Sequence, residues 1–312
     1  MARITHQIAV AKLEATYGTD IAPAATVAAD VLLCDNCTIN GFEAQIAERA
    51  RVVPWHGNRG RPGAYARSVQ IAPEVPLCGS GAAGTAPAWG KLMRMCGMAE
   101  VLTASTKADY APVSAGQESG SFYHFLDGSR HRALGARGSF VLNLVAGDEP
   151  TLAYNFTALY SDPTAVALPA AVYTAWRDAL VPRSGITTFS IGGNAYPMRS
   201  LRYTHGNTMA VRDIPQRYEV RITDRQPSME VTIEAPDGFS PANFFALANS
   251  ESEMAVLATH GTVAGDIIEL RANQARLMPG VKYDRDGDVA MMTMTFMPRP
   301  SAGNDEVLIT AR

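Results

Sequence analysis

The sequence has few cysteines and lacks a long hydrophobic run. It contains four cysteines in 312 residues, too few for a disulfide scaffold, so we expect free thiols and assembly in a reducing cytoplasm. The longest uncharged apolar stretches, 75–90 and 163–176, are interrupted by glycine or proline and do not suit a membrane span. The first residues show no signal-peptide apolar region. We therefore expect no membrane insertion.

A positive net charge is also missing. Lys and Arg number 27 against 30 Asp and Glu, which gives a net charge of -3 and a pI near 6.1. This balance argues against a general nucleic-acid binder, although it does not exclude a surface along which DNA merely passes. Hydrophobic residues make up 47% of the chain and charged residues 18%, so we expect a substantial core. The length suits two domains of ordinary size.

Recognisable catalytic motifs are absent from the sequence. The six histidines, at positions 6, 56, 124, 131, 205 and 260, are scattered, and neither H-E-x-x-H nor G-x-S-x-G occurs. A catalytic triad could still assemble in space, because its members need no fixed order along the chain. Nothing in the pattern points to one, and we expect no enzyme activity.

Three short motifs resemble binding sites, and each has a simpler interpretation. Gly79–Gly84 fits G-x-G-x-x-G, but Pro87 would start the next helix beyond the third glycine, which favours a tight turn over a dinucleotide site. Cys34 and Cys37 form a C-x-x-C without the second pair that zinc requires or the helix start that a redox pair requires. The acids at 284–288 resemble a calcium loop, but its twelfth position is threonine. We expect no cofactor and no metal.

The clearest structural pattern is a β-hairpin that occurs twice. Residues 138–160 contain two alternating runs around Gly147-Asp148, and a period of two indicates strands with one buried face. A shift of 140 positions places this turn on Gly287-Asp288, and the strands before the two turns match only if one residue is inserted at the turn. The same shift preserves the phase of the inward residues, so that Leu152, Tyr154 and Phe156 correspond to Met292, Met294 and Phe296. Because a slip of one residue would expose the wrong face, the match indicates a repeated unit.

Each repeat also contains one predicted helix. Residues 87–98 place Trp89, Leu92, Met93 and Cys96 on one face. In the second half, Ser240-Pro241 would open the equivalent helix with serine as its cap. A further short helical run is expected at 170–180. The chain is thus divided into an N-terminal arm at 1–30, a first β unit at 31–161, a connector at 162–185 and a second β unit at 186–312.

An arginine-rich loop at 49–67 has no apolar periodicity. Loops of this length without internal structure are uncommon and often functional. Its arginines could bind phosphate, but the loop also carries aromatic residues, which are enriched with arginine at protein interfaces. We favour a contact with another subunit over a DNA contact, and its candidate residues are Arg51, Trp55, Arg59, Arg61 and Tyr65.

Three stretches together resemble the tail tube, or major tail, proteins of long-tailed bacteriophages. Val10–Asp20 is similar to the opening of that family, and Gly79–Gly97 to its glycine turn and helix. Tyr123–Leu142, with Asp127-Gly128 and the run Gly135–Gly138, is similar to the approach to its final hairpin. The resemblance covers mainly the first half of the chain, and the second half is placed by the internal repeat.

The resemblance implies a structural virion protein and a mainly β fold. Its two tandem tail-tube-like units would be β-sandwiches or barrels, each with one flanking helix and a closing hairpin. Such units join into rings that stack into a hollow tube, through which phage DNA passes into the host without specific binding. Two units in one chain imply a trimeric ring with pseudo-sixfold symmetry. The expected partners are further copies of the chain, the tape-measure protein and the terminator and tip proteins, after assembly in the cytoplasm of the host bacterium.

A bore for DNA should avoid basic side chains, because Lys and Arg would bind phosphate. The acids in the two hairpin turns, Asp148, Glu149, Asp286 and Asp288, are candidates for the lumen or its rims. Two alternatives remain open at this stage. One is a tail accessory protein, such as a terminator or a receptor-binding β domain, and the other is a nucleotide-binding enzyme that uses the glycine turn.

Overall fold

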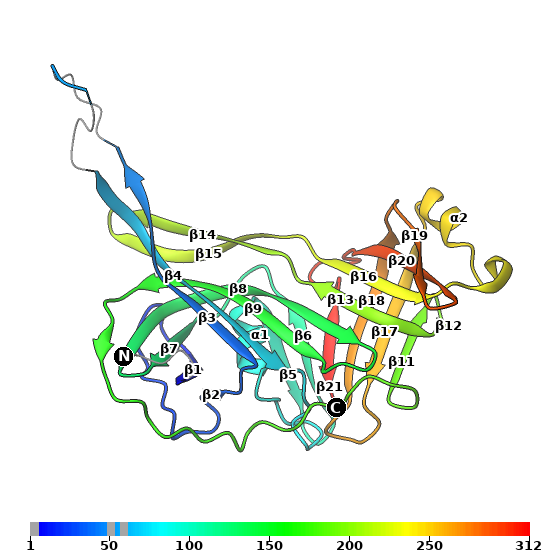
Figure 1. Cartoon of the computed structure of the whole chain (residues 1–312), viewed down its shortest axis with the longest axis horizontal. Helices are drawn as coiled ribbons and strands as arrows, with labels where there is room; N and C mark the ends of the chain where they lie inside the picture. The colour runs from blue at the N-terminus through cyan, green and yellow to red at the C-terminus, as the bar shows by residue number, and fades with distance from the viewer. Residues whose placement is uncertain (1–5, 49–53, 57–61) are drawn as a thin grey trace.

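The computed structural model describes residues 6–48, 54–56 and 62–312, and the protein is mainly β (Figure 1). The first half contains β1 (Gln7–Leu13), β2 (Val31–Leu32), β3 (Asn36–Ala47), β4 (Gly63–Pro76), α1 (Gly90–Met95), β5 (Met98–Thr103), β6 (Lys107–Pro112), β7 (Gly120–Leu126), β8 (Ser129–Val145), β9 (Thr151–Tyr160) and β10 (Thr164–Ala165). The second half contains β11 (Thr187–Ile191), β12 (Asn194–Ala195), β13 (Met198–Thr204), β14 (Asn207–Ile214), β15 (Arg217–Arg225), β16 (Ser228–Glu234), the 3₁₀ helix η1 (Asp237–Phe239), α2 (Phe244–Asn249), β17 (Glu253–His260), β18 (Ile268–Leu277), β19 (Lys282–Asp286), β20 (Val289–Pro298) and β21 (Leu308–Ala311).

The main strands of each half pair antiparallel in a defined order. In the first half the order from edge to edge is β3, β4, β9, β8, β7, β1 and β2. In the second half it is β13, β16, β20, β18, β17, β11 and β12, with β19 beside β18 on the same edge of β20. The order of the strands is the same in the two halves when β18 and β19 together are compared with β8.

The long strand β8 joins the two halves into one sheet. Its residues 129–136 pair with β7, whereas its residues 141–145 pair with β13 of the second half. A second connection comes from β21, which lies between β18 and β6. Within the described residues, these pairings connect nineteen strands, and β14 and β15 form a separate hairpin. The sheet therefore continues without interruption from one half to the other.

The two closing hairpins bury the residues that alternation predicts. Leu152, Tyr154 and Phe156 on β9 are buried, and so are the residues at the equivalent positions of β20, namely Met292, Met294 and Phe296. Phe156 lies opposite Ile71 of β4, and Phe296 lies opposite Met229 of β16. The preserved phase along the sequence thus corresponds to a preserved register between the strands.

A hydrophobic cluster runs through both halves. It contains Trp89, Leu92 and Met93 of the α1 region together with Phe156 and Phe296 of the closing hairpins. A smaller cluster covers the outer side of β1 and β7, where residues of the loop before β2 and of the connector pack. The strands pack as a β-sandwich around the larger cluster.

Both predicted helices exist, but each is shorter than the sequence indicated. α1 begins at Gly90 and not at Pro87, although the predicted apolar face is fully buried. α2 begins at Phe244, so the expectation that Ser240-Pro241 opens it is wrong. Its N-cap is Asn243, whose side-chain oxygen accepts the backbone N–H of Ala246 at 3.1 Å. Asparagine is as good an N-cap as serine.

The connector forms no helix at 170–180, where the sequence indicated one. It is an irregular strap across the first half, in which the indole of Trp176 donates a hydrogen bond to the carbonyl of Val31 at 2.9 Å. The backbone N–H of Val172 donates to the carbonyl of Ala25 at 3.1 Å. These contacts outweigh the weak helical preference of an alanine-rich run.

At the start of the chain, β1 pairs along its whole length with β7, so the stretch expected as an arm contributes a strand to the sheet.

The continuous core predicts that the two halves unfold together. Phe156→Ala and Phe296→Ala each remove a fully buried ring, and each substitution should cost about 3–5 kcal/mol. Urea denaturation followed by circular dichroism should show one transition for the wild type and for both variants, shifted to lower urea in the variants. Two separate transitions, only one of which moves in each variant, would contradict a shared core.

Candidate assembly interface

The hairpin of β14 and β15, here called the second arm, packs on the first half of the chain (Figure 1). Val220 on β15 is fully buried. Its backbone N–H donates to the hydroxyl of Tyr17 at 2.5 Å, and its carbonyl accepts from the guanidinium of Arg137 at 2.8 Å. The guanidinium of Arg137 also lies 4.8 Å from the centre of the Tyr17 ring. The second arm is thus held by backbone hydrogen bonds to side chains of the other half.

Buried polar groups fix the point where the second arm leaves the body. The side-chain amide of Asn207 donates to the carbonyls of Cys96 and Gly138 at 2.6 and 2.8 Å. His205 stacks on Phe140 with ring centres 4.8 Å apart, and its Nδ1 lies 2.9 Å from the hydroxyl of Tyr203. The backbone N–H of His205 donates to the carbonyl of Phe140 at 2.9 Å. These bonds connect the two halves beside the β8–β13 pairing.

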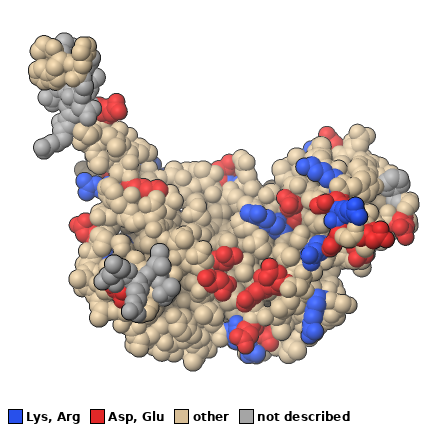
Figure 2. Space-filling model, viewed as in Figure 1, with Lys and Arg blue, Asp and Glu red and all other residues tan. Residues whose placement is uncertain are grey.

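The first arm consists of the outer parts of β3 and β4, at 41–47 and 63–67, and projects away from the body (Figures 1 and 2). Its described residues expose large apolar side chains, among them Phe42, Ile46 and Tyr65, and beyond them Trp55 is 59% exposed. The candidate arginines Arg51, Arg59 and Arg61 lie outside the described residues. Apolar groups that remain exposed on a projecting hairpin are typical of a surface that another molecule covers.

Three long strands of the sheet carry no positive charge. β9, β16 and β20 together contain no Lys or Arg, and their charged residues are Glu230 and Glu234. Outward positions carry small polar side chains, such as Asn155 on β9 and Thr295 on β20, which are exposed. In the view of Figure 2, Lys and Arg lie mainly over the second half, whereas Asp and Glu occur on both halves.

The candidate acids of the two hairpin turns lie at one end of the sheet. Arg199 connects the turns, because its guanidinium donates to the carbonyl of Ala146 at 2.9 Å and lies 3.3 Å from the carboxylate of Asp286. Asp148, Glu149 and Asp288 are exposed near these groups in the turns themselves. The structure therefore brings the four candidates together at one end, although the sequence places them in two distant turns.

Further acids extend this cluster. Loss of solvation and then the charges of Asp35, Asp148 and Asp178 raise the pKa of Glu149. Loss of solvation and the charge of Glu74 likewise raise the pKa of Asp35. Acids close enough to raise the pKa of Glu149 create a region of negative potential. This end of the molecule would repel phosphate.

β3 and β19 are among the strands of the sheet with an unpaired edge. Within the described residues, β3 pairs with β4 alone and β19 pairs with β20 alone. All five residues of β19 are exposed, and Tyr283 is exposed to 57%. An exposed strand edge offers unpaired N–H and C=O groups to another chain.

The segments 100–118 and 250–253 contain acids that could attract arginines of a neighbouring copy, but these acids have partners within the chain. Arg94 binds both carboxylate oxygens of Glu118 at 2.6 Å, and Glu100 accepts from Arg94 and from the hydroxyl of Tyr110. Glu251 pairs with Arg276 at 2.8 Å. These ion pairs leave little free negative charge in the segments 100–118 and 250–253 for a neighbouring molecule.

The glycine turn packs against a glycine turn of the second half. The backbone N–H of Gly81 donates to the carbonyl of Gly265 at 3.0 Å, and a side chain on Gly79 would collide with the same carbonyl. Close approach of two backbones thus explains the small residues of this turn.

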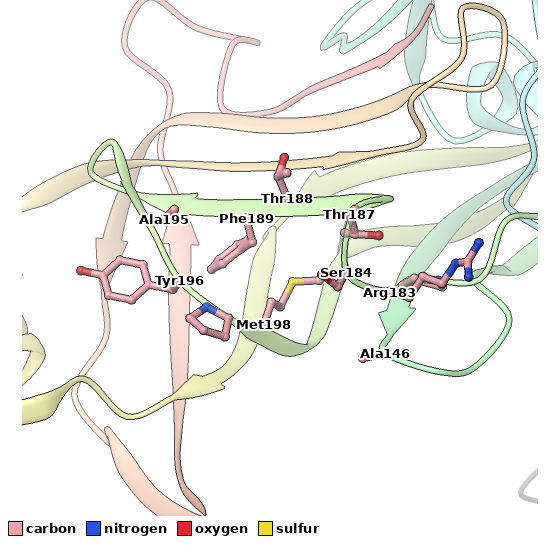
Figure 3. Close-up of a pocket in the computed structure, with 12 residues that line it drawn as sticks. Ala146, Arg183, Ser184, Thr187, Thr188, Phe189, Ala195, Tyr196 and Met198 are labelled. Atoms are coloured by element: carbon pink, nitrogen blue, oxygen red, sulfur yellow. The ribbon is translucent and has the colours of Figure 1, made fainter.

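A hollow of roughly 440 Å³ opens between β11, β13 and the end of the connector (Figure 3). Phe189, Tyr196 and Met198 line it together with Arg183, Pro182 and small residues, and no His, Cys, Asp or Glu is among its lining residues. It therefore offers no acid–base pair of its own.

Among the described residues, no group of three or more His, Cys, Asp or Glu side chains is placed to hold a metal ion. Within the same part of the chain, no helix has the length and apolar character to cross a membrane.

Comparison with known protein families identifies the family of the chain. The family model of the phage tail tube protein matches residues 5–308. The chain belongs to this family. A comparison with curated proteins finds no match. Membership makes the protein a structural component of a virion tail that oligomerises into a tube with other tail proteins.

Sequence reasoning about this tail tube protein missed the residues that hold the second arm. Tyr17, Arg137, His205 and Asn207 are separated by up to 190 positions, and no local pattern connects them. One indication was available for two of them, because Tyr17 and Arg137 lie in stretches that resemble the family. The sequence also did not indicate a contact between Cys37 and His124, in which the Sγ atom of Cys37 lies 3.6 Å from Nδ1 of His124.

The buried His205 predicts acid sensitivity at the joint between the halves. Burial, followed by the charge of Arg225, lowers the pKa of His205 to about 3. The unfolded chain takes up this proton near pH 6.5 and the folded chain only near pH 3, so stability falls as the pH decreases through that window. From pH 7 to pH 5 this loss should be about 2 kcal/mol. Urea denaturation of the unassembled protein at both pH values measures it.

The variant His205→Gln is the control for this effect. It keeps a neutral polar side chain near Tyr203 but removes the titration, so it should lose about 2 kcal/mol less than the wild type between pH 7 and pH 5. An equal loss in the two proteins would show that His205 does not cause the acid sensitivity.

Proposed function

We propose that this protein polymerises into stacked rings that form the hollow tail tube through which phage DNA reaches the host. The observation that carries the proposal is the continuous sheet, in which the strands β9, β16 and β20 carry no basic residue, although Arg202 on β13 is exposed. A bore lined by such strands has no cation that would bind the phosphate backbone and slow DNA. The acids at the two hairpin turns fit the rim of the same bore.

The ring is proposed to contain three copies with pseudo-sixfold symmetry. The matching order of strands in the two halves supports two tandem units, with the first at 31–161 and the second at 186–312. Closed rings need a heterologous interface whose rotation closes. The β8–β13 pairing within one chain has this head-to-tail character, because a strand of the first unit pairs with a different strand of the second.

The first arm is proposed to mediate stacking between rings. Tyr65 of the first arm and Trp55 in the loop beyond it are exposed, and both are of the types that contribute most to protein interfaces. The arginines Arg51, Arg59 and Arg61 would add charge-assisted hydrogen bonds there. The remaining proposed partners are the tape-measure, terminator and tip proteins at the ends of the tube, with assembly in the cytoplasm of the host.

Electron microscopy of the purified protein tests the proposal directly. We expect hollow tubes of uniform width, with three major and six minor repeats in end-on averages. A monomer that stays dispersed at every concentration would contradict the proposed function. Hexameric rings of the whole chain would contradict the trimeric arrangement alone.

Changes in the first arm should separate stacking from folding. Deletion of residues 54–64 should leave a soluble, folded protein that does not form tubes. Trp55→Ser combined with Tyr65→Ser should shorten the tubes, because it removes apolar contact area at about 25 cal/mol per Å². The matched control is Val263→Ser, which changes another exposed residue, 63% exposed, outside the arm.

Tube length in negative-stain images measures the effect. Tubes of wild-type length from the deletion variant would show that the first arm does not mediate stacking. Equal shortening by Val263→Ser would show that the effect is not specific to the arm.

A further inference from the structure

The pairing of β8 with β13 within the chain provides a template for a contact between chains. Five consecutive residue pairs join these strands, from Val141 opposite Thr204 to Val145 opposite Ser200. The inward-facing pairs, Leu142 with Tyr203 and Leu144 with Leu201, are all buried. This pairing extends the sheet from the first half into the second.

Equivalent positions in the other half follow from the strand registers. Leu142 lies opposite Leu152 of β9, and Tyr283 lies opposite Met292 of β20, which is the residue 140 positions after Leu152. Tyr283 on β19 therefore corresponds to Leu142 on β8. The whole of β19, residues 282–286, corresponds in this way to residues 141–145 of β8.

β3 corresponds to β13 in the same way. Ile71 and Met229 lie opposite Phe156 and Phe296, so these residues of β4 and β16 are equivalent. Ile71 lies opposite Ile39 of β3, and Met229 lies opposite Tyr203 of β13. Residues 36–40 of β3 thus correspond to residues 200–204 of β13.

Both of these equivalent segments, β3 and β19, have an unpaired edge. Within the described residues, neither β3 nor β19 has a partner on its second side. Their counterparts β13 and β8 use the corresponding sides to pair with each other. The chain thus carries one completed junction and the two separate halves of a second one.

We propose that β19 of one copy pairs antiparallel with β3 of the next copy, in the register of the β8–β13 template. This inference rests on the proposed ring. Replacing residues 141–145 of the template by 282–286, and residues 200–204 by 36–40, gives the register. Lys282 then lies opposite Asn40, Tyr283 opposite Ile39, Asp284 opposite Thr38, Arg285 opposite Cys37 and Asp286 opposite Asn36.

The side chains at these positions suit the proposed contact. Ile39 and Cys37 face the core side of β3, and Asn36, Thr38 and Asn40 are exposed on the other side. Tyr283 would then be covered by Ile39, as Leu142 is covered by Tyr203 in the template. Lys282, Asp284 and Asp286 would face the amide or hydroxyl groups of β3, so no like charges meet. Arg285 departs from the apolar template, but its side chain already turns to the carbonyl of Gly287 at the end of the strand.

Disulfide trapping tests the register. Directly opposite residues of antiparallel strands have Cα atoms about 4.5–5.5 Å apart, within the range that a disulfide spans, whereas diagonal neighbours lie about 7–8 Å apart. The test variant carries Asn40→Cys and Lys282→Cys, with Cys34→Ser to remove a partly exposed native thiol. The off-register control carries Asn40→Cys and Asp284→Cys on the same background. The template control carries Val141→Cys and Thr204→Cys, which should form a disulfide within one chain.

After mild oxidation of assembled tubes, the test variant should convert most of its monomer band into covalent dimers and trimers on non-reducing gels. The off-register control should remain almost entirely monomeric. Tubes that form without this crosslink, or with equal crosslinking in the off-register control, would overturn the proposed register and leave the tube function standing. Absence of both tubes and crosslinks, with the template control oxidised, would overturn the two together.

Discussion

The backbone hydrogen bonds between β8 and β13 are the constraint on which the rest of the structure depends. They turn two sets of strands with the same order into one sheet with one core, and they set the direction in which the sheet continues. β8 can serve both halves because it is 17 residues long, so that β7 pairs with its first part and β13 with its last part. A shorter strand would leave one of these neighbours unpaired, at the cost of buried backbone groups without partners. The buried bonds of Asn207 and His205 lie beside this junction and keep the second arm in line with it.

Local patterns predicted the parts of this fold that depend on local geometry. The alternation around Leu152 and Met292 identified buried faces correctly, because the side-chain direction in a strand changes with every residue. The helix ends and the run at 170–180 were wrong, because there the deciding contacts are distant in the sequence. Trp176 is fixed by Val31, 145 positions earlier, and a window of helical propensity contains no information about that bond. The acids of the two turns were candidates one by one and not as a cluster, since only the folded sheet connects Ala146 of the first turn with Asp286 through Arg199.

Surface ion pairs contribute little to holding the halves together. Arg199 and Asp286 are both about half exposed, and such pairs are worth only about 0–1 kcal/mol. Burial of apolar side chains in the shared cluster is a far larger contribution. Other ion pairs bear on assembly by neutralising acids on the surface. Glu100, Glu118 and Glu251 each pair with an arginine of the same chain. An acid that already has a partner gives no competing contact when another molecule approaches. In the proposed ring, recognition between copies would depend on strand edges, whose backbone hydrogen bonds are directional, and on the exposed apolar side chains of the first arm.

In the proposed ring, the presence of two units in one chain would change the thermodynamics of assembly. Each association of free molecules loses translational and rotational freedom, estimated at about 4–15 kcal/mol. In a trimer of double units, three of the six lateral junctions are β8–β13 pairings that form during folding, so only three junctions carry this cost. A covalently linked junction also has a high effective concentration. The separate edges of β19 and β3 can therefore be weak in isolation, which limits premature growth from single chains. In the proposed ring, closure would pair both of these edges in every copy, and they would no longer offer a lateral site to further copies.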